Sequence, residues 1–205
     1  MAERTLRVLH LHHTAMFGGA EASLLCLLRH LPPEVQSVLA CPEGGFVDQA
    51  GAAGRAEVRA VPAWDARWDL SPWGVFREYQ GLRALRHSLR LLVREFGPSL
   101  VHANSRPAAV AAVRGGAAGL PVVWHVRDLR MRGVVVRWLL HRCAAVIAIS
   151  RSVERLLIAA GCPRERLYQV YNGVDLSELR PERPAEEVRQ ELGVPRDAPM
   201  VVAVA

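Results

Sequence analysis

The sequence contains no lysine. Arginine supplies all 26 of its permanently basic side chains, against 20 acidic residues, so the 205-residue chain has a formal net charge of +6. A Schiff base and a Walker-type phosphate loop both need the lysine amine. The composition therefore excludes both kinds of chemistry.

Long hydrophobic runs and paired cysteines are missing too. No apolar stretch approaches the roughly 18 residues of a membrane span, and His10, His12 and His13 interrupt the segment where a signal peptide would need an apolar core. The four cysteines lie far apart and form no C-x-x-C pair, which favours reduced, buried thiols. We therefore expect a cytoplasmic protein, and its 51% apolar and 22% charged residues are typical of a globular chain.

Short apolar runs alternate with helical segments along most of the chain. The runs predict strands at residues 6–11, 35–41, 57–61, 100–103, 122–126, 145–149 and 166–171. Helical spacing predicts helices at residues 20–31, 46–53, 73–96, 107–118, 133–143 and 151–160, with an ordered loop at residues 62–72. Strands that are apolar throughout and alternate with helices indicate a parallel sheet covered on both faces. The predicted fold class is therefore α/β, with a Rossmann-like, doubly wound parallel sheet.

Composition changes near Leu176. Residues 1–175 carry a net charge of +8 and residues 176–205 a net charge of −2, and Pro181 and Pro184 at the change are typical of a linker. A short helix is predicted at residues 185–192 and a strand at residues 200–205. A strand with nothing after it is an unusual edge for a compact fold. We therefore expect a domain over residues 1–177, then a linker and the start of a second domain over residues 178–205, within a longer protein.

Polar residues follow the first predicted strand, at the edge where open parallel sheets bind ligands. Gly18 and Gly19 precede a helix, where backbone N–H groups can approach an anion, although two glycines can equally serve a tight turn. The histidines at positions 10, 12 and 13 raise the possibility of a metal site. No other metal-ligating side chain lies at suitable spacing, so we expect no metal.

Later strand ends supply a second group of polar side chains. Asn104 and Ser105 could bind a ligand or cap the following helix. A lone histidine in an apolar strand is more often a core residue, but His125 is followed at once by Arg127 and Asp128. An imidazole, a guanidinium and a carboxylate at one strand end suit a polyhydroxylated ligand or developing charge.

Together these segments resemble the N-terminal half of a retaining glycosyltransferase of family 4, whose members have two facing Rossmann-like domains (the GT-B fold). The matching segments occur in family order. They are Arg7-Val8-Leu9-His10, Gly18-Gly19-Ala20-Glu21, Leu100-Val101-His102-Ala103-Asn104-Ser105, Trp124-His125-Val126-Arg127-Asp128, Val146-Ile147-Ala148-Ile149-Ser150 and Val170-Tyr171-Asn172-Gly173-Val174-Asp175.

The resemblance implies transfer of a sugar from a UDP- or GDP-sugar to a glycan or lipid-linked acceptor, with retained configuration and without a cofactor, in cell-envelope or exopolysaccharide synthesis. It places Gly18, Gly19 and Glu21 at the donor diphosphate and acceptor, and His125 at the transferred sugar as the catalytic candidate. Seven further residues would bind acceptor or sugar: His12, Asn104, Ser105, Arg127, Asp128, Ser150 and Asn172. Most of the donor site lies in the family's second domain, so we expect this chain alone to be inactive.

Arginines gather in two predicted helical segments, residues 73–96 with a net charge of +3 and residues 127–142 with +4. They either form a solvated face or attach the protein to an anionic membrane surface. The candidate membrane contacts are Arg83, Arg86, Arg90, Arg94, Arg132, Arg137 and Trp138. Nucleic acid is not an expected partner, because aromatic residues do not interleave with the arginines.

Two other functions fit the same sequence. One is a stand-alone Rossmann-like module that binds an anionic ligand, and the other is half of a sugar-nucleotide epimerase.

Overall fold

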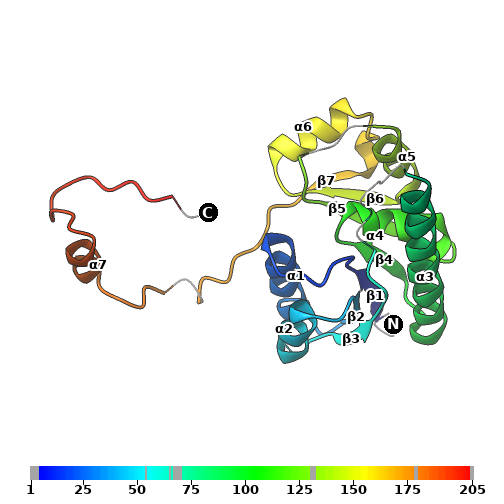
Figure 1. Cartoon of the computed structure of the whole chain (residues 1–205), viewed down its shortest axis with the longest axis horizontal. Helices are drawn as coiled ribbons and strands as arrows, with labels where there is room; N and C mark the ends of the chain where they lie inside the picture. The colour runs from blue at the N-terminus through cyan, green and yellow to red at the C-terminus, as the bar shows by residue number, and fades with distance from the viewer. Residues whose placement is uncertain are drawn as a thin grey trace. The chain divides into compact units, whose positions relative to one another are not determined.

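The fold is built on a seven-stranded sheet. The computed structural model describes residues 5–53, 55–64, 66, 71–129, 133–177 and 180–203. The strands are β1 (Leu6–Leu11), β2 (Val35–Cys41), β3 (Glu57–Ala60), β4 (Leu100–Ala103), β5 (Val122–Val126), β6 (Ala145–Ala148) and β7 (Leu167–Gln169). Their order in the sheet is β3-β2-β1-β4-β5-β6-β7, and all six pairings are parallel (Figure 1).

A helix joins each strand to the next. These helices are α1 (Gly19–Arg29), α2 (Gly45–Ala53), α3 (Pro72–Phe96), α4 (Arg106–Ala111), α5 (Val134–Arg142) and α6 (Arg151–Ala159). A π-helical turn, Ala112–Gly116, extends α4. This alternation confirms the predicted α/β, Rossmann-like fold with a parallel sheet.

Helices cover both faces of the sheet, because successive residues of a strand point to opposite sides. On one face, Leu9 and Leu11 of β1 belong to a core that includes buried side chains of α3, α4, α5 and α6. On the other face, Leu39 and Cys41 of β2 pack with α1 and with Phe46 of α2. The chain therefore buries a separate apolar layer on each side of the sheet.

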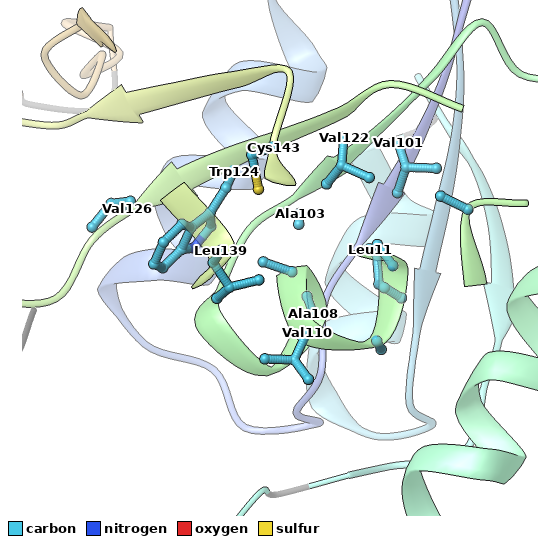
Figure 2. Packing of buried hydrophobic residues seen from close by; sticks show 14 of the residues in the cluster. Leu11, Val101, Ala103, Ala108, Val110, Val122, Trp124, Val126, Leu139 and Cys143 are labelled. Carbon is cyan, nitrogen blue, oxygen red and sulfur yellow. The ribbon is translucent and has the colours of Figure 1, made fainter. Parts of the chain in front are cut away.

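The larger core depends on small residues as much as on large ones. Trp124 of β5 is 1% exposed and lies beside Leu139 of α5, while Ala108 of α4 lies near Ala103 of β4 (Figure 2). Alanine at these positions lets α4 approach the sheet closely, and the indole fills the space beside it. The same tight packing fixes the backbone at the end of β5, where the candidate site residues follow.

Local signals set the ends of the long helix α3. The hydroxyl of Ser71 accepts a hydrogen bond from the backbone N–H of Gly74, and Pro72 occupies the first turn, where its missing N–H costs nothing. Gly97 ends the helix with φ +61°, a left-handed conformation that glycine adopts readily. Helix α3 therefore begins one residue before the predicted start and ends where the sequence predicts.

Four sequence predictions differ from the structure. The predicted apolar stripe of α3 is buried or half-buried from Leu82 onward, but Val75 and Tyr79 near its start are 53% and 60% exposed. Gly115, with φ +105°, interrupts the helix predicted over residues 107–118.

Strand β7 is shorter than the strand predicted over residues 166–171, since a 3-10 turn occupies Arg164–Arg166. The strand predicted at residues 200–205 is wrong for the described residues 200–203, which pair with no described strand and leave Val201 98% exposed.

The chain divides into two compact units, residues 1–173 and residues 174–205. The first contains the sheet and both cores. The second contains one described helix, α7 (Ala185–Glu191), in which no residue is buried. Part of the predicted loop at residues 62–72, including Trp68, lies outside the described residues.

Candidate functional site

The carboxyl ends of β1, β4 and β5 meet at one edge of the sheet. Strand β1 pairs with β2 on one side and with β4 on the other, so the chain connections leave in opposite directions. Such a reversal opens a crevice beyond the strand ends, which is where ligands bind in open α/β sheets. His12, Asn104 and Arg127 each follow one of these three strands directly.

Arg127 is the centre of a hydrogen-bond network. Its Nε donates to Oδ1 of Asn104 at 3.0 Å, and its Nη1 donates to Oγ of Ser23 and to Oδ1 of Asn172, both at 2.8 Å. Its Nη2 lies 3.4 Å from Nδ1 of His125. All four partners are uncharged oxygen or nitrogen atoms, so none of them neutralises the guanidinium.

A second chain of contacts joins Asn104 to a buried carboxylate. Nδ2 of Asn104 lies 3.3 Å from Nδ1 of His12, and Nε2 of His12 lies 2.5 Å from Oε1 of Glu21. Because an amide NH₂ can only donate, Nδ1 of His12 accepts, and its Nε2, which lies beside the Glu21 carboxylate, carries the ring proton. A neutral imidazole and an amide therefore link Arg127 to Glu21.

Burial sets the charge state of these groups. Burial, assisted by His13 and Arg127, lowers the pKa of His12 to about 3. Burial, assisted by Arg127 and His102, lowers the pKa of His125 to about 3. Burial also lowers the pKa of Arg127 to about 10, although Glu21 opposes this shift. At neutral pH the positive guanidinium of Arg127 thus lies among the uncharged imidazoles of His12 and His125.

A cavity of about 270 Å³ lies at this edge. Six of the predicted site residues line it: His12, Glu21, Asn104, Ser105, Arg127 and Asp128. Asn172 and His125 do not line it but contact Arg127, whereas Ser150 lies apart from it, after β6. Most of the predicted residues are therefore brought together, although they follow strands far apart in the sequence.

The loop after β1 is positioned by a close backbone approach. Gly44 has φ +142°, and a Cβ at this position would lie 2.7 Å from Cβ of Ala15, so glycine allows the two loops to touch. Gly18 precedes α1, and a Cβ there would lie 3.2 Å from a carboxylate oxygen of Glu21. Around Gly19 the space is open. The carboxylate of Glu21 thus lies beside the loop predicted to approach a diphosphate.

Two predicted site serines cap helices. The hydroxyl of Ser105 accepts from the backbone N–H of Ala108, and the hydroxyl of Ser150 accepts from that of Val153. Ser105 thus caps the first turn of α4, which follows β4, and Ser150 caps the first turn of α6, which follows β6. Contact of either hydroxyl with a ligand stays a prediction.

Three residues at this edge were not predicted from the sequence. Arg106 lines the cavity, and its Nε is buried without a hydrogen-bond partner among the described residues. Ser23 is in α1 and contacts Arg127, but its position in a helix gave no strand-end signal. Trp124 lines the cavity, and its indole Nε1 is buried without a hydrogen-bond partner among the described residues. Tryptophan in a strand first suggests core packing, so only the structure shows Trp124 at the cavity wall.

No metal-ligand cluster of three or more His, Cys, Asp or Glu side chains occurs within the described ranges. Independence from metals and cofactors stays a prediction.

The predicted arginine stripe lies on α3. Arg83, Arg90 and Arg94 are exposed and Arg86 is half-buried. In the second segment, Arg137 is exposed, whereas Trp138 packs against the larger core with the guanidinium of Arg114 over its ring at 5.3 Å. Arg132 lies outside the described residues. Among the helices described, none has the length and apolar character needed to cross a bilayer.

Comparisons with known proteins agree with this geometry. The sequence model of glycosyltransferase family 4 matches residues 17–178, while no curated protein matches the chain significantly. HepE from Anabaena, in a crystal structure with UDP-glucose, is 22% identical, with a TM-score of 0.67 over 92% of this chain and 50% of HepE.

Two further solved structures are similar. The lipopolysaccharide outer core galactosyltransferase WaaB is 14% identical, with a TM-score of 0.61 over 87% of this chain and 50% of WaaB. UDP-N-acetylglucosamine 2-epimerase from Rickettsia bellii is 14% identical, with a TM-score of 0.58 over 93% of this chain and 52% of the epimerase. The chain thus spans about half the length of these proteins, and its sheet matches one half of the GT-B architecture. Since the family model covers most of the sequence, the chain belongs to glycosyltransferase family 4.

Proposed function

We propose that the chain forms the acceptor-side half of a retaining glycosyltransferase. This enzyme transfers a sugar from a UDP- or GDP-sugar to a glycan or lipid-linked acceptor in the synthesis of cell-envelope polysaccharide or exopolysaccharide. The observation that carries the proposal is the 270 Å³ cavity at the reversal of the strand order, lined by Arg127 and other polar and charged side chains, in a member of this family. The crystal structure of HepE with UDP-glucose supports the choice of donor class.

The chemistry of the cavity suits a hydroxyl-rich ligand. Asn104 and Arg127 line its wall together with Trp124, whose buried indole N–H has no hydrogen-bond partner among the described residues. The carboxylate of Glu21 is engaged by His12, which leaves Asp128 as the other described carboxylate of the wall. This wall thus offers no free carboxylate pair of the kind that glycosidases use. The lack of such a pair among the described wall residues supports front-face attack, in which an oxygen of the leaving phosphate takes the proton of the acceptor hydroxyl.

The test is a transfer assay with labelled UDP- and GDP-sugars and with glycan and lipid acceptors. It uses both the 205-residue chain and the longest reading frame that contains it. We expect transfer by the longer protein and none by the chain alone, with NMR of the product showing the same anomeric configuration as the donor. Inverted configuration would reject the retaining mechanism, and the absence of transfer with every donor would reject the proposal.

A sugar-nucleotide epimerase is the second candidate, because the Rickettsia epimerase shares the fold. The family match favours the transferase, since it covers residues 17–178. Incubation of the longer protein with UDP-N-acetylglucosamine, without an acceptor, separates the two functions. Epimerised sugar nucleotide would favour the second candidate. Tight binding of a nucleotide by the chain without any turnover would instead favour a stand-alone binding module.

The surface of α3 supports action at the inner face of an anionic membrane. Near its start, Trp73 is 80% exposed and Phe76 is 53% exposed. Tyr79 lines both an apolar cavity of about 450 Å³ and a basic groove of about 650 Å³ that includes Arg83 and Arg90. Adjacent apolar and cationic surfaces suit an interface with acyl chains and phosphate groups.

Liposome flotation tests this membrane surface. Changing Arg83, Arg86, Arg90 and Arg94 to glutamate should abolish binding to anionic vesicles at low salt, since each basic group near such a surface contributes about 1 kcal/mol. The matched control changes four other exposed arginines, Arg142, Arg151, Arg155 and Arg164, to glutamate. Equal loss of binding in both variants would show that net charge, rather than this surface, is responsible.

A further inference from the structure

Four buried polar side chains form a line across one face of the sheet. Oγ of Ser37 on β2 lies 3.3 Å from Nε2 of His10 on β1, and Nδ1 of His10 lies 3.0 Å from Nδ1 of His102 on β4. Nε2 of His102 lies 3.2 Å from Nδ1 of His125 on β5. All four residues are at most 8% exposed. The line ends at the residue assigned to the transferred sugar.

The direction of these hydrogen bonds follows from Arg127. A guanidinium can only donate, so Nδ1 of His125 is an acceptor of the hydrogen bond from Arg127. His102 therefore donates from Nε2 and accepts at Nδ1. His10 in turn donates from Nδ1 and accepts at Nε2, and the hydroxyl of Ser37 donates to it. Each assignment determines the next, because a neutral imidazole has one donor and one acceptor nitrogen.

The imidazoles of the line are uncharged. Burial, together with the neighbouring His102, holds the pKa of His10 well below its ordinary value of 6.5. Burial and Arg127 lower the pKa of His102 to about 4. Protonation of His125 on Nδ1 would place that N–H against the guanidinium of Arg127, which can only donate. The neutral state is thus the one that the geometry accommodates.

We propose that Ser37, His10 and His102 are positioning residues, which hold His125 in the tautomer that carries its proton on Nε2. This inference rests on the proposed function for what His125 meets, but the tautomers stand on the contacts alone. Nε2 of His125 is buried and has no hydrogen-bond partner among the described residues. The line therefore leaves the N–H of His125 without a partner among the described residues, next to Arg127 of the cavity wall, and we assign its acceptor to an oxygen of the ligand, such as a sugar hydroxyl or the leaving phosphate.

This arrangement gives His125 a defined role. With its proton on Nε2 and its lone pair turned to Arg127 and His102, the ring can donate to a ligand but cannot accept a proton from one at Nε2. His125 would then stabilise oxygen that gains negative charge and would not act as the base for the acceptor.

The tautomers can be read directly by NMR. Long-range ¹H–¹⁵N correlations of the chain, labelled with ¹⁵N-histidine, distinguish the two ring nitrogens of each residue. We expect protons on Nδ1 of His10 and on Nε2 of both His102 and His125, unchanged between pH 7.5 and pH 6. A proton on Nε2 of His10, on Nδ1 of His125, or on both nitrogens of any of the three would overturn the proposal.

A pair of variants at position 102 tests the consequence in the longer protein. Glutamine keeps an amide donor close to the position of Nε2, whereas leucine removes it. We expect His102→Leu to lower kcat about tenfold or more with little change in donor KM, and His102→Gln to recover most of this loss. The control is His141→Leu, at an exposed position of α5. Equal kcat values for the leucine and glutamine variants would refute a positioning role.

The proposed function and the positioning role of His102 can be rejected independently of each other. If no donor supports transfer, the proposed function falls, but the tautomers in the wild-type chain still decide whether the line exists. If His102→Leu does not fold, the NMR measurement on the wild-type chain and the kcat of His102→Gln still decide the proposal. A kcat of His102→Gln as low as that of His125→Ala would count against it.

Discussion

At the residue scale, the site depends on Arg127 and on the uncharged groups that contact it. His12, Asn104 and Arg127 are predictable from the sequence, because each directly follows an apolar run. The two contacts by which Asn104 connects Arg127 to His12 are not predictable, because they depend on the pairing of β1, β4 and β5. The position of His10 opposite His102 is not predictable either, since strand register is a property of the folded sheet.

His125→Ala is expected to lower kcat more than it raises the donor KM. The lost N–H would act mainly on charge that develops in the transition state, so a loss of about a hundredfold in kcat is expected. Initial-rate kinetics of the longer protein measure this effect, with His141→Ala as the control. Unchanged turnover would remove His125 from the site.

Acid should destabilise the chain through its buried histidines. The pKa of His102 is about 4 in the folded chain, against an ordinary value of 6.5, so between these values the unfolded chain binds more protons. Stability is then fully present above pH 6.5 and falls as the pH drops towards 4. His102→Gln should reduce the slope of unfolding free energy against pH by about 1 kcal/mol per pH unit in this window.

Urea unfolding at several pH values measures that slope, with His141→Gln as the matched control. A slope in His102→Gln equal to that of the wild-type chain would contradict the burial of a neutral imidazole at this position.

At the scale of elements, the sequence predicts where helices begin better than how they continue. Ser71, Ser105 and Ser150 each precede a helix, and each hydroxyl caps its first turn. The structure after α4 was harder to predict, because the π-helical turn there packs against α3. The exposure of Val75 in α3 was not predictable either. The spacing of apolar residues predicts which face of a helix is buried, but not how far along the helix a neighbouring element covers that face.

Ser150→Ala tests whether this hydroxyl only caps α6. Loss of the bond to the N–H of Val153 should reduce the free energy of unfolding by about 1 kcal/mol. Ser152→Ala, at an exposed position of the same helix, is the control and should change stability little. If Ser150 only caps, the KM values of the folded variant stay at the wild-type level, whereas a raised acceptor KM would indicate contact with the ligand.

At the scale of the whole molecule, residues 1–173 hold both apolar cores and the candidate site, whereas no residue of α7 is buried. The change in charge and the prolines near Leu176 predict such a division, because they are local features of the sequence. The strand predicted over residues 200–205 did not form in the described part, since a strand needs a neighbour with which to pair.

Truncation after residue 177 should therefore leave the first unit folded. We expect the urea midpoint to stay close to that of the full chain, because none of the described residues after position 177 belongs to either core. Circular dichroism and the fluorescence of the five tryptophans, all of which precede residue 177, follow the transition. A large fall in the midpoint would show that the second unit contributes to the stability of the first.

The entirely parallel sheet also determines how the chain reaches this structure. Every described pairing joins strands separated by a crossover, so no pair can form as a local hairpin. The entropy of closing each crossover must be lost before the pairing can compensate it, which makes folding slower than in a helical bundle of the same length. During that time, apolar strands such as β1 and β5 are exposed. The nascent chain is therefore at greatest risk of aggregation before its central strands have paired.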